Sequence, residues 1–248
     1  MNIPIGLQLY SVRAAFQENP LATLQAVKKM GYEGVEFFGA PKYCAEFYVG
    51  LLKETGLTCC GWLWSNVLDP AGLEAGISFN KAIGNYTLIC GSVKHESLAG
   101  IKANAKRFNE VADILAPHGM RIGYHSHKGD HPLVDGVSPW DVLMDNTDER
   151  VIMQLDTGNS MDGGADILDI LNRYPGRCQT IHMKPYREGQ YVTGIRPVIG
   201  EDDCPWREVI DFCRTKGRTE WFIVEYGNTE PNALETAEQC LRGLQSFL

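Results

Sequence analysis

Short apolar runs alternate with amphipathic, helix-like segments along the whole chain. At each junction a helical pattern ends in a small residue, and a run rich in apolar and β-branched residues begins shortly afterwards. Such residues let a helix end in a left-handed conformation and the chain return to a sheet. The junction residues are Gly31, Gly56, Gly84, Gly119, Gly176 and Gly217, with Asn146 in the same place before VIMQLD. Together with the first run, IPIGLQLY, they predict eight strands, each followed by a helix.

Proline predicts where several of these helices begin. Asn19 and Ser138 are capping residues that stand before Pro20 and Pro139, and Cys204-Pro205 leads into WREVIDFCRTK; in each case the proline takes the first helical position. The segment 97–119 has an apolar stripe at helical spacing, as expected of a helix that covers a sheet, formed by Ile101, Phe108, Val111, Ile114 and Leu115. The segment 232–248 repeats that pattern and would complete the ring.

Strands that alternate with amphipathic helices predict an α/β protein with parallel strands. Eight such units predict a (β/α)8 barrel, the TIM-barrel architecture, and we expect residues 1–248 to form a single domain. An open doubly wound sheet is the alternative. It is disfavoured because no GxGxxG follows the first run and because polar strand ends are spread over the whole sequence.

Composition narrows the class of protein. The 248 residues are 44% hydrophobic, enough for a full core, and carry a net charge of −8, which argues against general binding to nucleic acid or anionic membranes. No run approaches the ~18 apolar residues of a membrane span, and the N-terminus lacks signal-peptide features, so we expect a cytoplasmic protein. The eight cysteines form no CxxC pair and are interpreted as buried free thiols.

Four of the apolar runs end in side chains that can bind a metal. They supply His125 and His127, Asp156, His182 and Glu225. The carboxyl ends of barrel strands meet at one rim, so we expect these groups to converge there. Imidazoles and carboxylates suit one divalent ion, Mn, Mg, Co or Zn. Because alternate residues of a strand share a face, either His125 or His127 could be the ligand from its run.

Further polar and aromatic residues fall at or near the same rim. Lys184 follows His182 on the same strand face. Glu36 lies in an otherwise apolar run, where it can accept a substrate hydroxyl or form a buried ion pair. Trp62 can stack on a sugar ring or pack in the core.

Motifs from both ends of the chain carry a family resemblance. LQLYSVR, GYEGVEF, GYHSH, LDTGN, IHMK, GEDDCPWREVI and IVEYG resemble the xylose isomerase-like superfamily of sugar isomerases and epimerases. In its ketose epimerases, a Glu, Asp, His and Glu from strands five to eight hold one divalent metal. The resemblance implies Asp156, His182 and Glu225 for the last three. It places Asn159 where many relatives have a substrate-contacting His.

The fifth strand departs from that pattern. His125 stands where the ketose epimerases carry a Glu, so one of the two carboxylates that exchange a proton with the sugar is missing. A neutral imidazole can still bind a metal, and either histidine can act as a general base near neutral pH.

The resemblance implies a metal-dependent sugar isomerase or epimerase. Glu225 or a fifth-strand histidine such as His127 would remove the proton next to a carbonyl, and Lys184 would stabilise the resulting oxyanion. Glu36, Asn159 and Trp62 are the candidate contacts to the small-molecule sugar.

Other functions remain open at this point. The leading alternative is a lyase or dehydratase that acts on a 3-keto-glycoside or keto-inositol. A phosphodiester hydrolase, as in abasic-site endonucleases that share the fold, is disfavoured by the acidic charge. A further hypothesis is a barrel that binds a sugar without catalysing a reaction. The sequence leaves the sugar, the metal and the subunit number undetermined, and a homo-oligomer is compatible with it.

Overall fold

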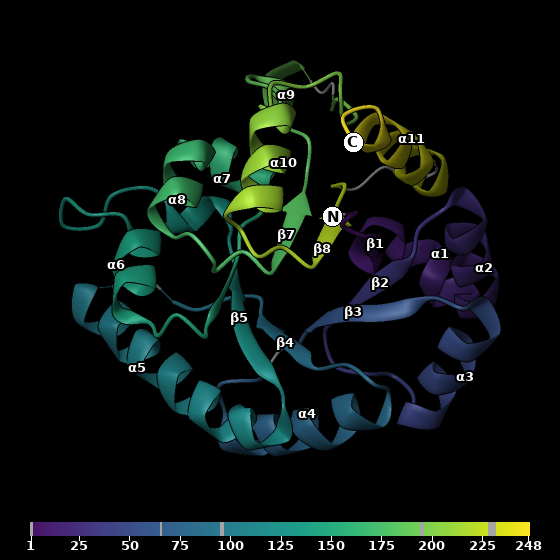
Figure 1. The fold of residues 1–248 in the computed structure, drawn as a ribbon, viewed down its shortest axis with the longest axis horizontal. Coiled ribbons are helices and arrows are strands. Elements are labelled where there is room, and N and C mark those ends of the chain that lie inside the picture. Colours follow the sequence, from purple (N-terminus) through teal and green to yellow (C-terminus); the bar gives the residue numbers. More distant parts are fainter. Residues whose placement is uncertain (1, 65, 95–96, 194–195, 228–231) are drawn as a thin grey trace.

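Eight parallel strands form the centre of the molecule (Figure 1). The computed structural model describes residues 2–64, 66–94, 97–193, 196–227 and 232–248. The strands are β1 (Ile5–Gln8), β2 (Gly34–Phe38), β3 (Thr58–Leu63), β4 (Thr87–Cys90), β5 (Arg121–His125), β6 (Ile152–Gln154), β7 (Thr180–Met183) and β8 (Trp221–Val224). Each pairs in parallel with its sequence neighbour from β1 to β6, and β1 also pairs with β8, which pairs with β7.

Helices surround the strands on the outside (Figure 1). They are α1 (Arg13–Glu18), α2 (Pro20–Met30), α3 (Ala45–Thr55), α4 (Pro70–Ala82), α5 (Leu98–Leu115), α6 (Pro139–Asn146), α7 (Thr157–Asp162), α8 (Ile167–Arg173), α9 (Gln190–Thr193), α10 (Trp206–Thr215) and α11 (Ala233–Gln245). Short 3-10 turns at Leu9–Val12, Ala116–His118 and Lys128–Asp130 complete the described elements. The last helix, α11, contacts α2, which brings the two ends of the chain together.

The barrel closes between β6 and β7 without a regular ladder. Asp156 and His182 form an isolated parallel bridge, and the His182 amide donates to Leu155 O at 2.9 Å. Nearer the start of these strands, the Met153 amide donates to Arg177 O at 2.7 Å. The predicted (β/α)8 barrel is therefore confirmed, and two of the expected metal ligands lie at its closing seam.

The predicted helix ends are mostly confirmed. Gly31, Gly56, Gly84, Gly119 and Gly176 have positive φ, between 66° and 115°. The prediction for Gly217 was wrong: its amide still bonds to Phe212 O in the last turn of α10, and the left-handed residue is Arg218, at φ 54°. The prediction for Asn146 was also wrong, because Asn146 is the last helical residue of α6 and its side chain donates to Val142 O at 2.7 Å.

The predicted helix starts hold for two of three prolines. The side chains of Asn19 and Ser138 accept the amides of Ala22 and Asp141, each before a proline that opens the helix. At α10 the prediction was wrong by one residue: the helix begins at Trp206 and Pro205 precedes it. In the stripe of α5, Ile114 is 44% exposed, whereas Ile101, Phe108, Val111 and Leu115 are buried.

Two predictions from composition, on membrane-spanning segments and on the cysteines, can be compared with the structure. Among the described helices, none combines the length and the apolar character needed to cross a membrane. All eight cysteines lie in the described ranges and all are free; Cys44 is exposed and the other seven are buried.

Candidate metal centre and its cavity

Four potential ligands from four strands converge at the carboxyl end of the barrel. His125 ends β5, His182 lies in β7, and Asp156 and Glu225 follow β6 and β8 directly. One ligand atom of each lies within 4.8 Å of the others, and all four side chains are buried. The cluster contains His125. His127 is exposed beside it, with its ring centroid 4.7 Å from that of His125.

Asp156 gives the clearest sign that this cluster fits a cation. Its Oδ1 accepts the Asn159 amide at 2.7 Å, but its fully buried Oδ2 has no hydrogen-bond partner among the described residues. That oxygen lies 3.8 Å from His182 Nδ1 and 3.9 Å from His125 Nε2. Burial raises the pKa of the Asp156 carboxyl to about 6. A cation would remove the cost of leaving this oxygen unpaired, so the residues present fit a divalent metal.

A second layer of buried polar side chains orients the two imidazoles from below. Glu36 Oε2 lies 2.6 Å from His182 Nε2 and accepts a hydrogen bond of 2.6 Å from Gln8 Nε2. Gln154 donates to Glu36 Oε1 at 2.8 Å, and its own Oε1 lies 3.1 Å from His125 Nδ1. Hydrogen bonds of this kind fix the ring orientation of metal-binding histidines.

A glycine in β3 makes room for Glu36. A Cβ at Gly61 would lie 2.6 Å from Glu36 Oε1. The register of β2 and β3 also shifts at this point, so that Glu36 pairs with Gly61 and the preceding Val35 with Cys59. The irregular register thus places the one residue without a side chain beside the buried carboxylate.

The two buried imidazoles have opposite electrostatic environments. Burial alone would lower the pKa of His182, but the carboxylates of Glu36 and Glu225 outweigh it and raise that pKa to about 10. Burial, together with the neighbouring His182 and His127, lowers the pKa of His125 well below its usual value. His125 is therefore neutral and ready to bind a metal, whereas His182 would have to release a proton.

Lys184 links this centre to the residues above it. Its Nζ lies 2.8 Å from Glu225 Oε1, 2.9 Å from Asn159 Oδ1 and 3.7 Å from Asp156 Oδ2. Although burial works in the other direction, Lys184 and His182 hold the pKa of Glu225 well below its usual value. Asn159 is anchored by its own Nδ2, which donates to Ser126 O at 3.1 Å.

A cavity of 520 Å³ opens above the cluster. Of the residues predicted from the sequence, His125, His127, Asn159, Lys184 and Glu225 line it. Phe38 and Gln8 line it as well. Phe38 was not singled out in the sequence, and neither was Gln154 below the cavity. Gln154 could have been found, because it precedes Asp156 by two residues in the same apolar run.

Two predicted substrate contacts lie elsewhere. Glu36 is fully buried beneath His182, and Trp62 is buried in an aromatic cluster, stacked on Phe37 with 4.8 Å between ring centroids. The Trp62 indole nitrogen donates to Gly39 O at 2.8 Å. Neither side chain lines this cavity, and for both a direct contact with substrate stays a prediction.

Known proteins share this fold and parts of this sequence. An inosose dehydratase of Lactiplantibacillus plantarum is 26% identical over 160 residues, which cover 58% of this chain and 53% of the relative. The chain thus spans about half the length of the curated relatives it matches. A sugar phosphate isomerase/epimerase of Parabacteroides distasonis superposes with a TM-score of 0.82 at 19% identity, over 99% of this chain and 94% of that one. The 3-keto-D-glucoside 4-epimerase of E. coli gives a TM-score of 0.69 at 14% identity, over 99% and 100% of the two chains.

A family profile covers most of the molecule. The family described as xylose isomerase-like TIM barrel matches residues 24–246. This range includes the four converging ligands and seven of the eight strands. The chain belongs to the xylose isomerase-like TIM-barrel family.

Proposed function

We propose that this protein is a metal-dependent enzyme that removes a proton next to the carbonyl of a keto-sugar or keto-polyol and returns it, as an isomerase or epimerase. The observation that carries the proposal is the buried Asp156 Oδ2, which makes no hydrogen bond to the described residues and lies within 4 Å of two imidazoles. The named relatives that act on sugars and inositol derivatives support the substrate class.

His125, Asp156, His182 and Glu225 would hold the metal. Bound there, a divalent ion supplies Lewis-acid polarisation of a substrate carbonyl. Their mixed nitrogen and oxygen donors suit Mn, Co or Zn better than Mg, which prefers oxygen.

Two side chains on different walls of the cavity would remove and return the proton. His127 reaches the cavity from the β5 side, where an imidazole can accept a proton near neutral pH. Lys184 reaches it from the β7 side, fixed between Glu225 and Asn159, so that its ammonium can stabilise an oxyanion or return a proton. Groups on different walls suit removal of the proton on one face of the substrate and its return on another.

A dehydratase is the second candidate. The sequence relatives named inosose dehydratase favour it, as does the histidine in place of a fifth-strand carboxylate. Loss of water would need the same base and the same stabilised oxyanion: the C–O bond at the carbon beyond the deprotonated one breaks, and the departing hydroxyl takes up a proton and leaves as water. In the isomerase or epimerase, by contrast, the proton returns to a carbon and no group leaves.

An isotope experiment tests the proposal. Manganese-loaded protein is incubated in heavy water with a ketohexose, a keto-inositol and a 3-keto-glycoside, and the products are followed by NMR. We expect deuterium at the carbon next to the carbonyl, and His127→Asn should slow its entry by about 10²–10⁴-fold. His118→Asn, a change of an exposed histidine in the 3-10 turn after α5, should leave the rate unchanged. An unsaturated product would identify the dehydratase; no exchange and no elimination on any compound would contradict both functions.

A further inference from the structure

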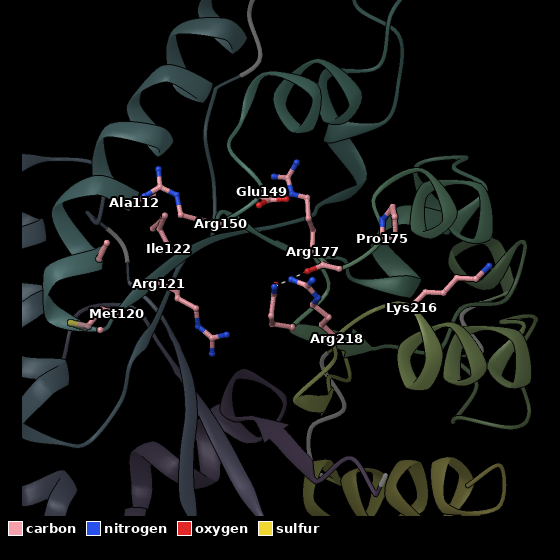
Figure 2. A pocket seen from close by; sticks show the side chains of 14 residues that line it. Ala112, Met120, Arg121, Ile122, Glu149, Arg150, Pro175, Arg177, Lys216 and Arg218 are labelled. Carbon is pink, nitrogen blue, oxygen red and sulfur yellow. Dashed lines mark hydrogen bonds between the residues drawn. The ribbon is translucent and has the colours of Figure 1, made fainter.

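A second cavity lies at the opposite end of the strands from His125, Asp156, His182 and Glu225, which we call the candidate metal cluster. Its volume is 710 Å³, and it is lined by the start of β5 and by the loops that lead into β6, β7 and β8. Figure 2 shows the side chains of Arg121, Arg150, Arg177, Lys216 and Arg218 around it. Glu149 is the single carboxylate among the lining residues. In a chain with a net charge of −8, this is a pronounced local concentration of positive charge.

Two of these cations are already neutralised by acidic partners. Arg121 makes two hydrogen bonds to the Glu220 carboxylate, at 2.7 and 2.6 Å. Arg150 pairs with Asp148 at 2.8 Å and with Asp113 at 2.9 Å. These contacts build the wall of the cavity and leave little charge for a ligand.

The other three cations are not compensated in this way. Within the described ranges of the chain, no carboxylate lies at ion-pair distance from Arg177, Lys216 or Arg218. Arg177 is buried and donates to neutral oxygens, including Met144 O at 2.8 Å and Thr147 Oγ1 at 2.7 Å. Lys216 and Arg218 are exposed at the rim. An anion in the cavity would meet two available side chains and a fixed buried charge behind them.

The backbone conformation of Arg218 places its side chain against the loop that contains Gly176. Arg218 has φ 54°, a conformation that residues other than glycine seldom adopt and that tends to persist at functional positions. Its Cδ, Nε and Cζ lie 3.5 to 3.7 Å from the place a Cβ would take at Gly176, which itself has φ 77°. The guanidinium therefore lies along a glycine backbone that leaves space for it.

An unused acceptor lies in the same wall. Gln179 Nε2 donates to Gly176 O at 2.8 Å, but the buried Gln179 Oε1 has no hydrogen-bond partner in the part of the chain that the structure describes. A buried carbonyl oxygen of this kind is normally paired. This oxygen has less than 1 Å² of accessible surface, so the hydroxyl group of a ligand would supply the missing donor once the Gln179 side chain turns toward the cavity.

We propose that this cavity is a binding site for a phosphorylated sugar or polyol, separate from the metal cluster. Lys216 and Arg218 contact the phosphate, the buried Arg177 charge favours its dianionic form, and a hydroxyl of the ligand donates to Gln179 Oε1. This site does not depend on the reaction proposed for the opposite end of the barrel.

Calorimetric titration of the whole protein with glucose 6-phosphate and with inorganic phosphate tests this site, with glucose as the uncharged control. The test variant is Lys216→Ala/Arg218→Asn, because asparagine tolerates the left-handed conformation at position 218. A matched control, Lys29→Ala/Lys53→Ala, removes the same charge from exposed positions on α2 and α3. We expect glucose 6-phosphate to bind more tightly than phosphate, and the test variant to weaken binding by at least about tenfold, with the control within about twofold.

Further outcomes keep the proposal falsifiable. The single change Lys216→Gln alters only an exposed side chain, so it covers the case in which the double variant does not fold, and it should weaken binding by about threefold. Binding that is absent at millimolar ligand, equally strong for glucose, or unchanged in the test variants overturns the proposal. So does binding that Glu225→Gln weakens, because the sugar phosphate would then occupy the metal-cluster cavity.

Discussion

At the scale of single residues, a fully buried carboxylate, Glu36, lies beneath the candidate metal centre and outside the lining of its cavity. Glu36 is enclosed by Gln8, Gln154 and His182, and its place requires a glycine at position 61. A lone acidic residue in an apolar strand would be costly to bury. Here it is satisfied by three partners, and its charge acts on the imidazole that would bind the metal.

Glu36→Gln should therefore weaken metal binding while leaving the fold intact. The amide keeps the size of the side chain but loses the charge that holds His182 in place, and changes at this distance from a metal typically cost about 10–100-fold in affinity. The measurement is calorimetric titration with Mn²⁺. Glu54→Gln, at an exposed position of α3, should bind Mn²⁺ like the unmodified protein. Equal affinity of the two variants would show that Glu36 does not position His182.

At the scale of elements, α11 packs against the loop between β7 and α10 on the outside of the barrel. Gly243 in this helix packs directly against the carbonyl of Ile199, so closely that an added Cβ would collide with that oxygen. Ile199 is itself buried. The close approach lets the last helix cover the loop beside β8 and contact α2 on its other side.

Two glycine-to-alanine changes should therefore have opposite effects. Gly243→Ala should destabilise the protein by about 1–3 kcal/mol, because a backbone atom must move to admit the methyl group. Gly50→Ala, in α3 with nothing within 4 Å of the new Cβ, should stabilise it by roughly 0.5–1 kcal/mol, because alanine restricts the unfolded chain. Urea unfolding measures both. If the Gly243→Ala protein unfolds at the same urea concentration as the unmodified protein, then α11 is free to shift away from Ile199.

At the scale of the whole molecule, the candidate metal cluster coincides with the closing seam of the barrel. Six neighbouring strand pairs within β1–β6 and β7–β8 and one across β1–β8 form ladders. Between β6 and β7 the connection is an isolated bridge of Asp156 and His182 with a few backbone bonds. A metal held by these two residues would join the strands where the sheet is least regular.

Metal binding should thus stabilise the barrel and protect this seam in particular. At a metal concentration of 100 times Kd, the gain is about 2.7 kcal/mol, or roughly 5–10 °C in Tm for a chain of this size. Hydrogen exchange should slow in peptides from β6 and β7 and remain unchanged in β2 and β3. Asp156→Ala should remove both effects. Equal slowing of hydrogen exchange in all strands would show that the metal does not stabilise the junction of β6 and β7 in particular.

Most of the fold could be predicted from the sequence, because periodicity and glycine placement are local properties. Glycines such as Gly56 and Gly119 adopt positive φ at the end of a helical segment wherever the chain turns back. The exceptions have local causes that need coordinates. Arg218 takes the left-handed position in place of Gly217 because the Gly217 amide continues to bond to α10.

The candidate site was only partly readable from the sequence. By itself, the sequence determined the order of strands and the four groups at their carboxyl ends, since a parallel barrel must gather those ends at one rim. Only the tertiary structure decided that Glu36 lies beneath His182, that Trp62 packs in the core, and that basic residues from the start of β5 and from three loops share a cavity at the other end. These are contacts between distant segments, and the relative rotation and register of the strands, which no local pattern encodes, bring them about.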